Sequence, residues 1–204
     1  MKIIKIVSQP KHQFLLCLDN GNEISIGEDV LIKYNLSKDL IVDESFIDTI
    51  LNEDTINKCF NRGLFYLGYG MRTKKQLCQY LTNKGFEEEV SQEAVSRLEK
   101  KGYINDLIFA QTLIDNWSET KSYGKKVMLN KLYERGFSKE TIENIAFPSE
   151  DSLIEKAKEL AVAKWPSIKG KSSYDRKGKL YRYLYSRGFD YDTISKVMGE
   201  IEDE

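Results

Sequence analysis

Asn83-Lys84-Gly85-Phe86 is followed along this 204-residue chain by two similar segments, Glu134-Arg135-Gly136-Phe137 and Ser186-Arg187-Gly188-Phe189. The glycines of the three segments are separated by 51 (136 − 85) and 52 (188 − 136) residues, which indicates an internal repeat. Apolar residues lie eight and four positions before each glycine: Leu77 and Leu81, Met128 and Leu132, and Leu180 and Leu184. This spacing predicts one helix in each copy. We expect the glycine to end that helix in the left-handed conformation, with the following Phe packed on the preceding Leu.

Two further helices are expected in each copy. Apolar pairs at helical spacing follow each Phe, and Ser138 and Asp190 are suited to cap the helices that two of these pairs predict. The pairs are Val90 and Ala94, Ile142 and Ile145, and Ile194 and Val197. A third helical stretch precedes each glycine helix, at residues 55–67, 106–121 and 152–164. Each copy is therefore a three-helix unit of about fifty residues, and because units of this size bury little apolar surface alone, we expect the copies to stack.

The first fifty residues predict a small β unit. Short β-rich runs at residues 3–7, 14–18 and 23–26 predict a three-stranded meander. Asn20-Gly21 favours a type I′ turn, in which both central residues have positive φ. Residues 28–35 and 43–51 predict two short helices that cover the sheet.

The predicted fold is therefore mainly α, with three tandem three-helix repeats in an elongated, curved array after a small N-terminal β-meander unit with short helices. The predicted boundaries are residues 1–52 for the β unit and 53–104, 105–148 and 149–204 for the three repeats. Helical repeat arrays present extended surfaces to other macromolecules, so binding is a more natural function for this fold than catalysis.

Composition excludes several classes of protein. The chain has 31 basic and 32 acidic residues, a mean hydropathy of −0.49 and no apolar run near the roughly 20 residues of a membrane span, so we expect a cytoplasmic protein with no membrane partner. Its 3 cysteines are widely spaced, which favours reduced thiols. The single histidine, His12, is expected in an exposed loop. With no glycine-rich phosphate loop and no His-Glu metal motif, the sequence argues against an enzyme, a metal site or a cofactor.

Basic residues gather at the starts of the helices that end in the three glycines. They are Arg72, Lys74 and Lys75 in the first copy, Lys125 and Lys126 in the second, and Arg176, Lys177, Lys179 and Arg182 in the third. Basic charge at a helix N-terminus opposes the helix dipole and costs about 0.3 to 1 kcal/mol per exposed residue. Because local stability does not explain the pattern, we predict that these residues bind a partner or DNA. A solvated helix face is the alternative.

Aromatic residues accompany the basic cluster of the third copy. Residues 164–187 contain 8 basic residues and a single acid, Asp175, interleaved with Trp165, Tyr174, Tyr181, Tyr183 and Tyr185. This mixture suits phosphate neutralisation combined with base stacking. The alternative, favoured for each single tyrosine, is a half-buried position at the edge of the core.

Several segments together resemble the signature of the RecX family of recombinase regulators. The most diagnostic is Lys101-Gly102-Tyr103-Ile104-Asn105-Asp106, followed by Phe109-Ala110. Arg72-Thr73 with Leu77, Leu81 and Lys84-Gly85 is similar to the first repeat of that family, and Gly124 with the segment from Lys131-Leu132 to Gly136 is similar to the second. The resemblance covers residues 55–199, with an insertion in the third repeat at residues 166–172.

The resemblance implies a modulator of the RecA recombinase that acts in DNA repair, homologous recombination and the SOS response. Members of the family have tandem three-helix repeats, lie in the groove of the RecA–DNA filament, and typically inhibit its ATP hydrolysis, strand exchange and coprotease activity. The resemblance implies no catalytic residue. The expected partners are the RecA filament and, more weakly, single- or double-stranded DNA, and the expected state is a monomer. The alternative is a helical-repeat DNA-binding protein that acts without a recombinase.

The diagnostic motif also has a purely structural interpretation. Tyr103 is expected in the core or at a junction between repeats, and Asn105-Asp106 is expected to cap the next helix. On this interpretation, which we favour, the motif marks the border between two repeats and makes no direct contact with a partner.

Overall fold

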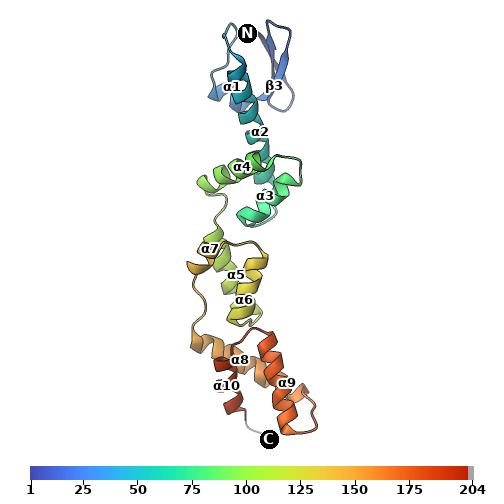
Figure 1. Ribbon diagram of the computed structural model, residues 1–204, viewed down its shortest axis with the longest axis vertical. Helices are drawn as coiled ribbons and strands as arrows, with labels where there is room; N and C mark the ends of the chain where they lie inside the picture. The colour runs from blue at the N-terminus through green and yellow to red at the C-terminus, as the bar shows by residue number, and fades with distance from the viewer. Residues whose placement is uncertain (202–204) are drawn as a thin grey trace. The chain divides into compact units, whose positions relative to one another are not determined.

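The computed structural model describes residues 1–201, so the last three residues of the third predicted repeat lie outside the described residues. Helices dominate the described chain and follow a small sheet, as the sequence predicted (Figure 1). The strands are β1 Ile3–Gln9, β2 Gln13–Leu18 and β3 Glu23–Gly27. The helices are α1 Glu28–Lys33, α2 Glu44–Leu67, α3 Lys74–Thr82, α4 Glu88–Lys100, α5 Asp106–Thr120, α6 Lys125–Glu134, α7 Lys139–Glu143, α8 Glu150–Lys164, the short 3-10 helix η1 Trp165–Ser167, α9 Ser173–Ser186 and α10 Tyr191–Glu200.

The three strands form an antiparallel sheet in the order β1-β2-β3, which confirms the predicted meander. The turn between β2 and β3 differs from the prediction. Gly21 has a positive φ of 87°, but Asn20 does not, so the type I′ assignment is wrong. Leu18 donates its N–H to the carbonyl of Asn22 at 2.9 Å and accepts one from Gly21 at 3.1 Å, so a longer loop with one left-handed residue connects the strands.

Helix α2 replaces two helices that the sequence predicted separately, at residues 43–51 and 55–67. It runs without a break, and Asp43 caps it by accepting a hydrogen bond from the N–H of Phe46 at 2.8 Å. No glycine or proline occurs within α2 before Gly63, so no residue breaks the helix near residue 52. The predicted border at residues 52 and 53 therefore lies inside α2. Ile50 packs in the core of the β unit and Cys59 in the core of the first repeat.

The chain forms two compact units, each with two hydrophobic cores. The first unit contains residues 1–71 and 77–104, with one core beneath the sheet and a second between α2, α3 and α4. The other contains residues 72–76 and the chain from Asn105 onward, with one core for α5 to α7 and another for α8 to α10. The first turn of α3 thus belongs to the second unit, although the rest of α3 belongs to the first.

Helices α3, α6 and α9 end as the sequence predicted. The six apolar residues of the stripe are all fully buried: Leu77, Leu81, Met128, Leu132, Leu180 and Leu184. Gly85, Gly136 and Gly188 have φ values of 94°, 83° and 94°. The N–H of the following Phe donates to the carbonyl of the Leu five residues earlier, at 3.4, 3.2 and 3.3 Å respectively. Each helix therefore closes with a Schellman motif.

Helices α4, α7 and α10 follow these glycines, as predicted. Ser138 and Asp190 cap α7 and α10 by accepting hydrogen bonds from the N–H groups of Thr141 and Thr193. Helix α7 is short, so Ile145 of the predicted apolar pair lies beyond its end.

Candidate partner-binding surface and repeat junctions

The nine basic residues that the sequence singled out lie in three separate places. Arg72, Lys74 and Lys75 lie at the start of α3, Lys125 and Lys126 at the start of α6, and Arg176, Lys177, Lys179 and Arg182 along α9. The start of α3 contacts the end of α6, and the start of α6 contacts the end of α9. The basic residues of α9 instead lie near the segment that precedes α9. The first two groups therefore take part in contacts between repeats.

The start of α6 docks on the end of α9. The N–H of Gly124 donates to the carbonyl of Arg187 at 2.9 Å, and the N–H of Lys126 donates to the carbonyl of Gly188 at 3.1 Å. A Cβ on Gly124 would overlap the carbonyl group of Gly188, and a Cβ on Gly188 would overlap Val127. Both positions therefore require glycine, and the junction between these two repeats is a contact between main chains.

A related contact joins the start of α3 to the end of α6. Thr73 is fully buried, and its hydroxyl donates to the carbonyl of Arg135 at 3.0 Å. The side chain of Lys75 crosses Gly136, where a Cβ would come within 2.6 Å of Cδ of the lysine. The carboxylate of Asp106, in the second repeat, accepts a hydrogen bond from the N–H of Lys74 at 3.1 Å. Asp106 thus supplements the cap of α3, where Thr73 accepts a hydrogen bond from the N–H of Gln76 at 3.1 Å, while Asn105 caps α5.

These contacts give basic residues at the helix starts a structural role that the sequence analysis did not find. The C-terminal end of a helix carries partial negative charge, and the starts of α3 and α6 lie against the ends of α6 and α9. A lysine at such a start is unfavourable for the dipole of its own helix, but it is favourable for the dipole of the helix whose end it contacts. Lys126 also places its Nζ 3.0 Å from the hydroxyl of Tyr185 and 4.8 Å from the centre of its ring. The same interaction lowers the pKa of Tyr185.

The basic residues of α9 contact the segment that precedes the helix. The guanidinium of Arg176 lies 4.1 Å from the ring centre of Trp165. Lys179 donates from Nζ to the carbonyl of Lys169 at 2.8 Å and pairs with Asp175 at 3.0 Å. The hydrogen bond from Lys179 lowers the pKa of Asp175. The insertion in the third repeat is therefore fastened to the first turns of α9.

One stripe of α9 carries three tyrosines around an open position. At 100° per residue, Tyr174, Gly178, Tyr181 and Tyr185 fall within about 60° of one another around the helix. Tyr174 is 90% exposed and Tyr185 is 49% exposed, and the rings of Tyr181 and Tyr185 are nearly parallel, with centres 6.3 Å apart. A Cβ added to Gly178 would meet no atom within 4 Å, so the stripe has open space between Tyr174 and Tyr181.

The other aromatic residues of the third repeat fit the core-edge interpretation better. Tyr183 is half-buried and lies beneath the cations of Lys164 and Arg187, with distances of 5.7 and 5.3 Å to the ring centre. Trp165 is half-buried beside Arg176. The two tyrosines at the ends of the stripe are therefore the exposed aromatic groups of α9.

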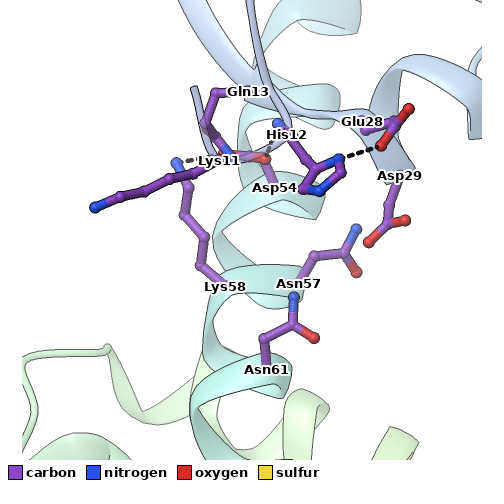
Figure 2. A pocket seen from close by; sticks show the side chains of 10 residues that line it. Lys11, His12, Gln13, Glu28, Asp29, Asp54, Asn57, Lys58 and Asn61 are labelled. Carbon is purple, nitrogen blue, oxygen red and sulfur yellow. Dashed lines mark hydrogen bonds and ion pairs between the residues drawn. The ribbon is translucent and has the colours of Figure 1, made fainter. Parts of the chain in front are cut away.

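A polar cavity of about 310 Å³ in the first unit involves none of the predicted binding residues (Figure 2). It lies between the loop at residues 11–13, the start of α1 and the middle of α2. His12, 85% exposed as expected for a loop residue, places Nδ1 2.9 Å from a carboxylate oxygen of Glu28. Asp54 accepts a hydrogen bond from the N–H of Gly27 at 2.7 Å and pairs with Lys58 at 2.6 Å. Several charges of the lining are thus matched within the chain.

Glu53, the residue before Asp54, links three helices of the first unit. It is 7% exposed, accepts two hydrogen bonds from Arg97 of α4 at 2.6 and 3.0 Å, and pairs with Lys33 at the end of α1 at 2.7 Å. The hydrogen bonds from Arg97 are the main cause that lowers the pKa of Glu53 to about 2. This carboxylate therefore joins the β unit to the first repeat.

Residues 1–201 contain neither a cluster of metal-ligating side chains nor a membrane-spanning helix. No three His, Cys, Asp or Glu side chains in this range are grouped so that they could hold a metal ion. No helix in this range is both long and apolar enough to cross a membrane. The three cysteines are free thiols, and burial raises the pKa of Cys59 to about 11.

Comparison with known proteins shows the family. Residues 59–98 match the model of the first three-helix domain of RecX, and residues 150–198 match that of the third. The regulatory protein RecX of Bacillus subtilis (strain 168) is 32% identical over 99% of this chain and 78% of its own length. The chain belongs to the RecX family.

Further RecX proteins and solved RecX structures agree. The regulatory protein RecX of Oceanobacillus iheyensis is 30% identical over 98% of this chain and 77% of its own length. A crystal structure of regulatory protein RecX matches with a TM-score of 0.82 and 25% identity, over 98% of this chain and 99% of that chain. The crystal structure of RecX from Lactobacillus salivarius matches with a TM-score of 0.68 and 26% identity, over 72% of this chain and 97% of that chain. The predicted family and fold class are confirmed, and the expectation of a protein that is no enzyme agrees with relatives named regulatory proteins.

Most residues of the RecX signature have structural roles here. Gly102 ends α4 with a φ of 79°, Ile104 is buried in the core of the first repeat, Asn105 caps α5 by accepting a hydrogen bond from the N–H of Ile108, and Phe109 and Ala110 are buried in the core of the second repeat. Tyr103 is the exception. It is 52% exposed and contacts the ring of Phe60 edge-on, so of its two predicted positions the core is wrong, and a position at the junction between repeats stays a prediction.

The sequence analysis missed the junction role of Thr73 and Gly124 in this RecX chain. A signal was present, because Thr73-Lys74-Lys75 and Gly124-Lys125-Lys126 share a small residue followed by two lysines. They are 51 residues apart (124 − 73), which is also the distance from Gly85 to Gly136. The pattern therefore belonged to the repeat and indicated a contact that both copies make.

Proposed function

We propose that this protein binds the RecA–DNA filament and inhibits its ATP hydrolysis, strand exchange and coprotease activity. Membership in the RecX family supports RecA as the partner. The surface that supports the proposal best is α9 with the segment before it. Residues 169–182 hold Lys169, Lys171, Arg176, Lys177, Lys179 and Arg182 against the single acid Asp175.

Such a surface suits a polyanion. An excess of five positive charges (6 − 1) on fourteen residues favours DNA phosphates, or an acidic surface of a recombinase protomer, through long-range attraction. The exposed rings of Tyr174 and Tyr185 add faces on which unpaired bases can stack. The proposed contact of this surface is therefore the nucleic acid of the filament, with the recombinase held beside it.

Inhibition then needs no chemistry on this chain. A repeat protein that touches two neighbouring protomers, or one protomer and the DNA, gains affinity because its second contact is intramolecular. A bound state that favours one conformation of the filament slows every step that requires the other conformation. ATP turnover, strand exchange and coprotease activity would all fall for this reason.

The test is ATP hydrolysis by RecA on single-stranded DNA with increasing amounts of the protein. We expect the triple variant Lys169→Glu, Lys171→Glu and Arg182→Glu to need at least tenfold more protein for half-inhibition. These side chains are exposed, and the ion pairs of α9 keep their partners. The matched control reverses three exposed lysines elsewhere, Lys5→Glu, Lys38→Glu and Lys139→Glu, and should inhibit like the original protein. Equal inhibition by all three proteins would refute the proposed surface.

A second candidate function is direct binding of single-stranded DNA without a recombinase, which the tyrosine stripe favours. Replacing Tyr174 and Tyr185 with alanine should weaken binding of an oligothymidine about tenfold or more, since base stacking is worth about 1–3 kcal/mol per base. Capture of RecA by the immobilised protein, with and without nuclease, distinguishes the two functions. If RecA is captured only through intact DNA and ATP turnover is unaffected, the second function holds and the first does not.

A further inference from the structure

The equivalent ends of α3, α6 and α9 in the three repeats have the same build, and two of these three ends are covered. Helix α4 closes in the same way at Gly102, which is also uncovered but lies at a different position in its repeat. Lys84-Gly85-Phe86, Arg135-Gly136-Phe137 and Arg187-Gly188-Phe189 close α3, α6 and α9 with the same left-handed glycine and the same pair of hydrogen bonds. The ends at Gly136 and Gly188 are each covered by a helix start from the preceding repeat. At Gly85, an added Cβ would meet no atom of the chain within 4 Å. We call this third surface the open cap.

The two covered caps show what kind of group fits on such a surface. Each receives a small residue followed by two lysines, Gly124-Lys125-Lys126 on α9 and Thr73-Lys74-Lys75 on α6. The small residue donates a hydrogen bond to a carbonyl at the end of the helix in both contacts, and the N–H of Lys126 donates a further one, at 2.9 to 3.1 Å. The second lysine of each start, Lys75 or Lys126, lies against the end of the helix, which carries partial negative charge. Shape, hydrogen bonding and charge therefore all select a cationic helix start.

The open cap has the same backbone carbonyl groups as the covered caps, but no helix start of the described chain lies against them. Lys84 and Gly85 are exposed, and no described residue donates a hydrogen bond to either carbonyl. The residues that follow the open cap are more acidic than those that follow the two covered caps, which favours a cationic occupant. Glu87-Glu88-Glu89 follows it, and all three residues are exposed, whereas the covered caps are followed by Ser138-Lys139-Glu140 and Asp190-Tyr191-Asp192.

Within residues 1–201, no helix start of this kind is left for this position. Thr73 and Gly124 lie four residues before Leu77 and Met128, and the residue four before Leu180 is Arg176. Helix α9 also continues one turn further towards its N-terminus, to Ser172, which caps it. A second copy of this chain therefore offers no spare start with a small residue at the required place.

We propose that the open cap is a docking site for a helix start of another protein, with Gly, Ser or Thr at its N-cap and lysines at the next two positions. The site goes beyond the surface proposed on α9, because it is acidic and selects a cationic peptide, whereas α9 is basic and selects a polyanion. Its test uses the full-length chain and requires no recombinase, so it succeeds or fails independently of the proposed function.

The probe is a side-chain-stapled helical peptide copied from residues 121–134, which contains the start that docks on α9. Amide shifts of the ¹⁵N-labelled protein are followed as peptide is added to millimolar concentration. We expect the largest shifts at Gly85, Phe86 and Glu88. The control peptide carries Gly124→Val, whose Cβ would collide with the cap as it would with Gly188. It should need at least tenfold higher concentration for the same shifts.

A variant of the protein supplies the second control. Asparagine tolerates the left-handed conformation better than most residues that have a side chain, and a Cβ at residue 85 meets no other atom, so Gly85→Asn should lower the thermal midpoint by about 2–5 °C and leave the protein folded. The same substitution should abolish the peptide shifts because the occupant is blocked. Shifts that are absent, equal for both peptides, or unchanged in Gly85→Asn would overturn the proposal. So would an oligothymidine that shifts the same amides more strongly than the peptide does.

Discussion

Two junctions in this chain are built from different chemistry. Where the β unit meets the first repeat, the nearly buried carboxylate of Glu53 pairs with Arg97 and Lys33. Where the second repeat meets the third, Gly124 and Gly188 bring two main chains together. The first junction depends on charge and the second on the absence of side chains. They should therefore fail under different conditions, the first in acid and the second when a methyl group is added.

The tryptophans make the two junctions separately observable. The chain has 2 tryptophans, Trp117 and Trp165, and both lie in the unit that contains the second and third repeats. Tryptophan fluorescence therefore reports unfolding of that unit. Amide hydrogen exchange in α2 and α4 reports the unit that contains the charged junction.

The largest effect is expected from Gly124→Val. A Cβ at this residue overlaps the carbonyl group of Gly188, so the two repeats must separate and lose their hydrogen bonds. We expect a loss of about 3–5 kcal/mol in the free energy of unfolding measured by tryptophan fluorescence in urea.

The control for that variant is Gly178→Ala, in an open position within α9. Alanine there should raise stability by about 0.5–1 kcal/mol, because glycine is the poorer helix former. A Gly124→Val protein with an unchanged fluorescence transition would contradict the main-chain junction.

Arg97→Met should give the next largest effect, in the other unit. It leaves the nearly buried carboxylate of Glu53 with Lys33 alone, so the cost should be about 2–3 kcal/mol, below the roughly 3–5 kcal/mol of a buried charge left without any partner. Amide exchange in α2 and α4 should accelerate accordingly, while the fluorescence transition stays in place. The exposed pair Lys139 and Glu143 provides the control, since Lys139→Met should cost about 0.5 kcal/mol or less.

Acid should weaken the charged junction more than the main-chain junction. The pKa of Glu53 is about 2 in the folded chain, below its ordinary value of 4.5, so its contribution is complete above pH 4.5 and disappears as the pH falls through 2. The size of this contribution is on the order of 2–3 kcal/mol. Exchange in α2 and α4 should accelerate between pH 4.5 and 2, and Glu53→Gln should remove most of this dependence. An unchanged dependence in that variant would show that other carboxylates are responsible.

Asp106→Ala should have the smallest effect of the set and tests a junction of mixed type. Its carboxylate supplements the cap of α3 through the N–H of Lys74, so loss of this hydrogen bond should cost about 1–2 kcal/mol. Amide exchange should accelerate at Lys74 and Lys75. Asn105→Ala is the neighbouring control, because it removes the cap of α5 and should accelerate exchange at Ile108 instead. Equal effects of both variants on α3 would contradict the assignment.

The sequence predicted the features of this fold that depend on near neighbours. The left-handed glycines, the buried stripes before them, and the caps Ser138 and Asp190 are all set within about eight residues. These features were correct. Errors arose where a local pattern permitted two outcomes, as in α2, whose two predicted segments contain no residue that would separate them.

The junctions could not be predicted in the same way, because they join residues that are far apart in the sequence. Thr73 bonds the carbonyl of Arg135, 62 residues away, and Gly124 bonds that of Arg187. A repeat of small residue and two lysines was visible, but its partner surface was not. The sequence therefore indicated the candidate binding residues only as a charge pattern. The structure shows in addition that Lys75 contacts Gly136 and Lys126 contacts Tyr185 across the junctions.

Each junction depends on residues that come later in the sequence, and this affects the order in which the repeats can fold during translation. The start of α3 needs Asp106, Arg135 and Gly136, and the start of α6 needs Arg187 and Gly188, so each repeat is completed by the one synthesised after it. At roughly 5–20 residues per second, the ribosome needs on the order of 3–10 s to extend the chain from Gly136 to Gly188. During that time, we expect the start of α6 in the nascent second repeat to lack its contact with the end of α9. Helix α9 needs no successor, because Ser172 caps it locally.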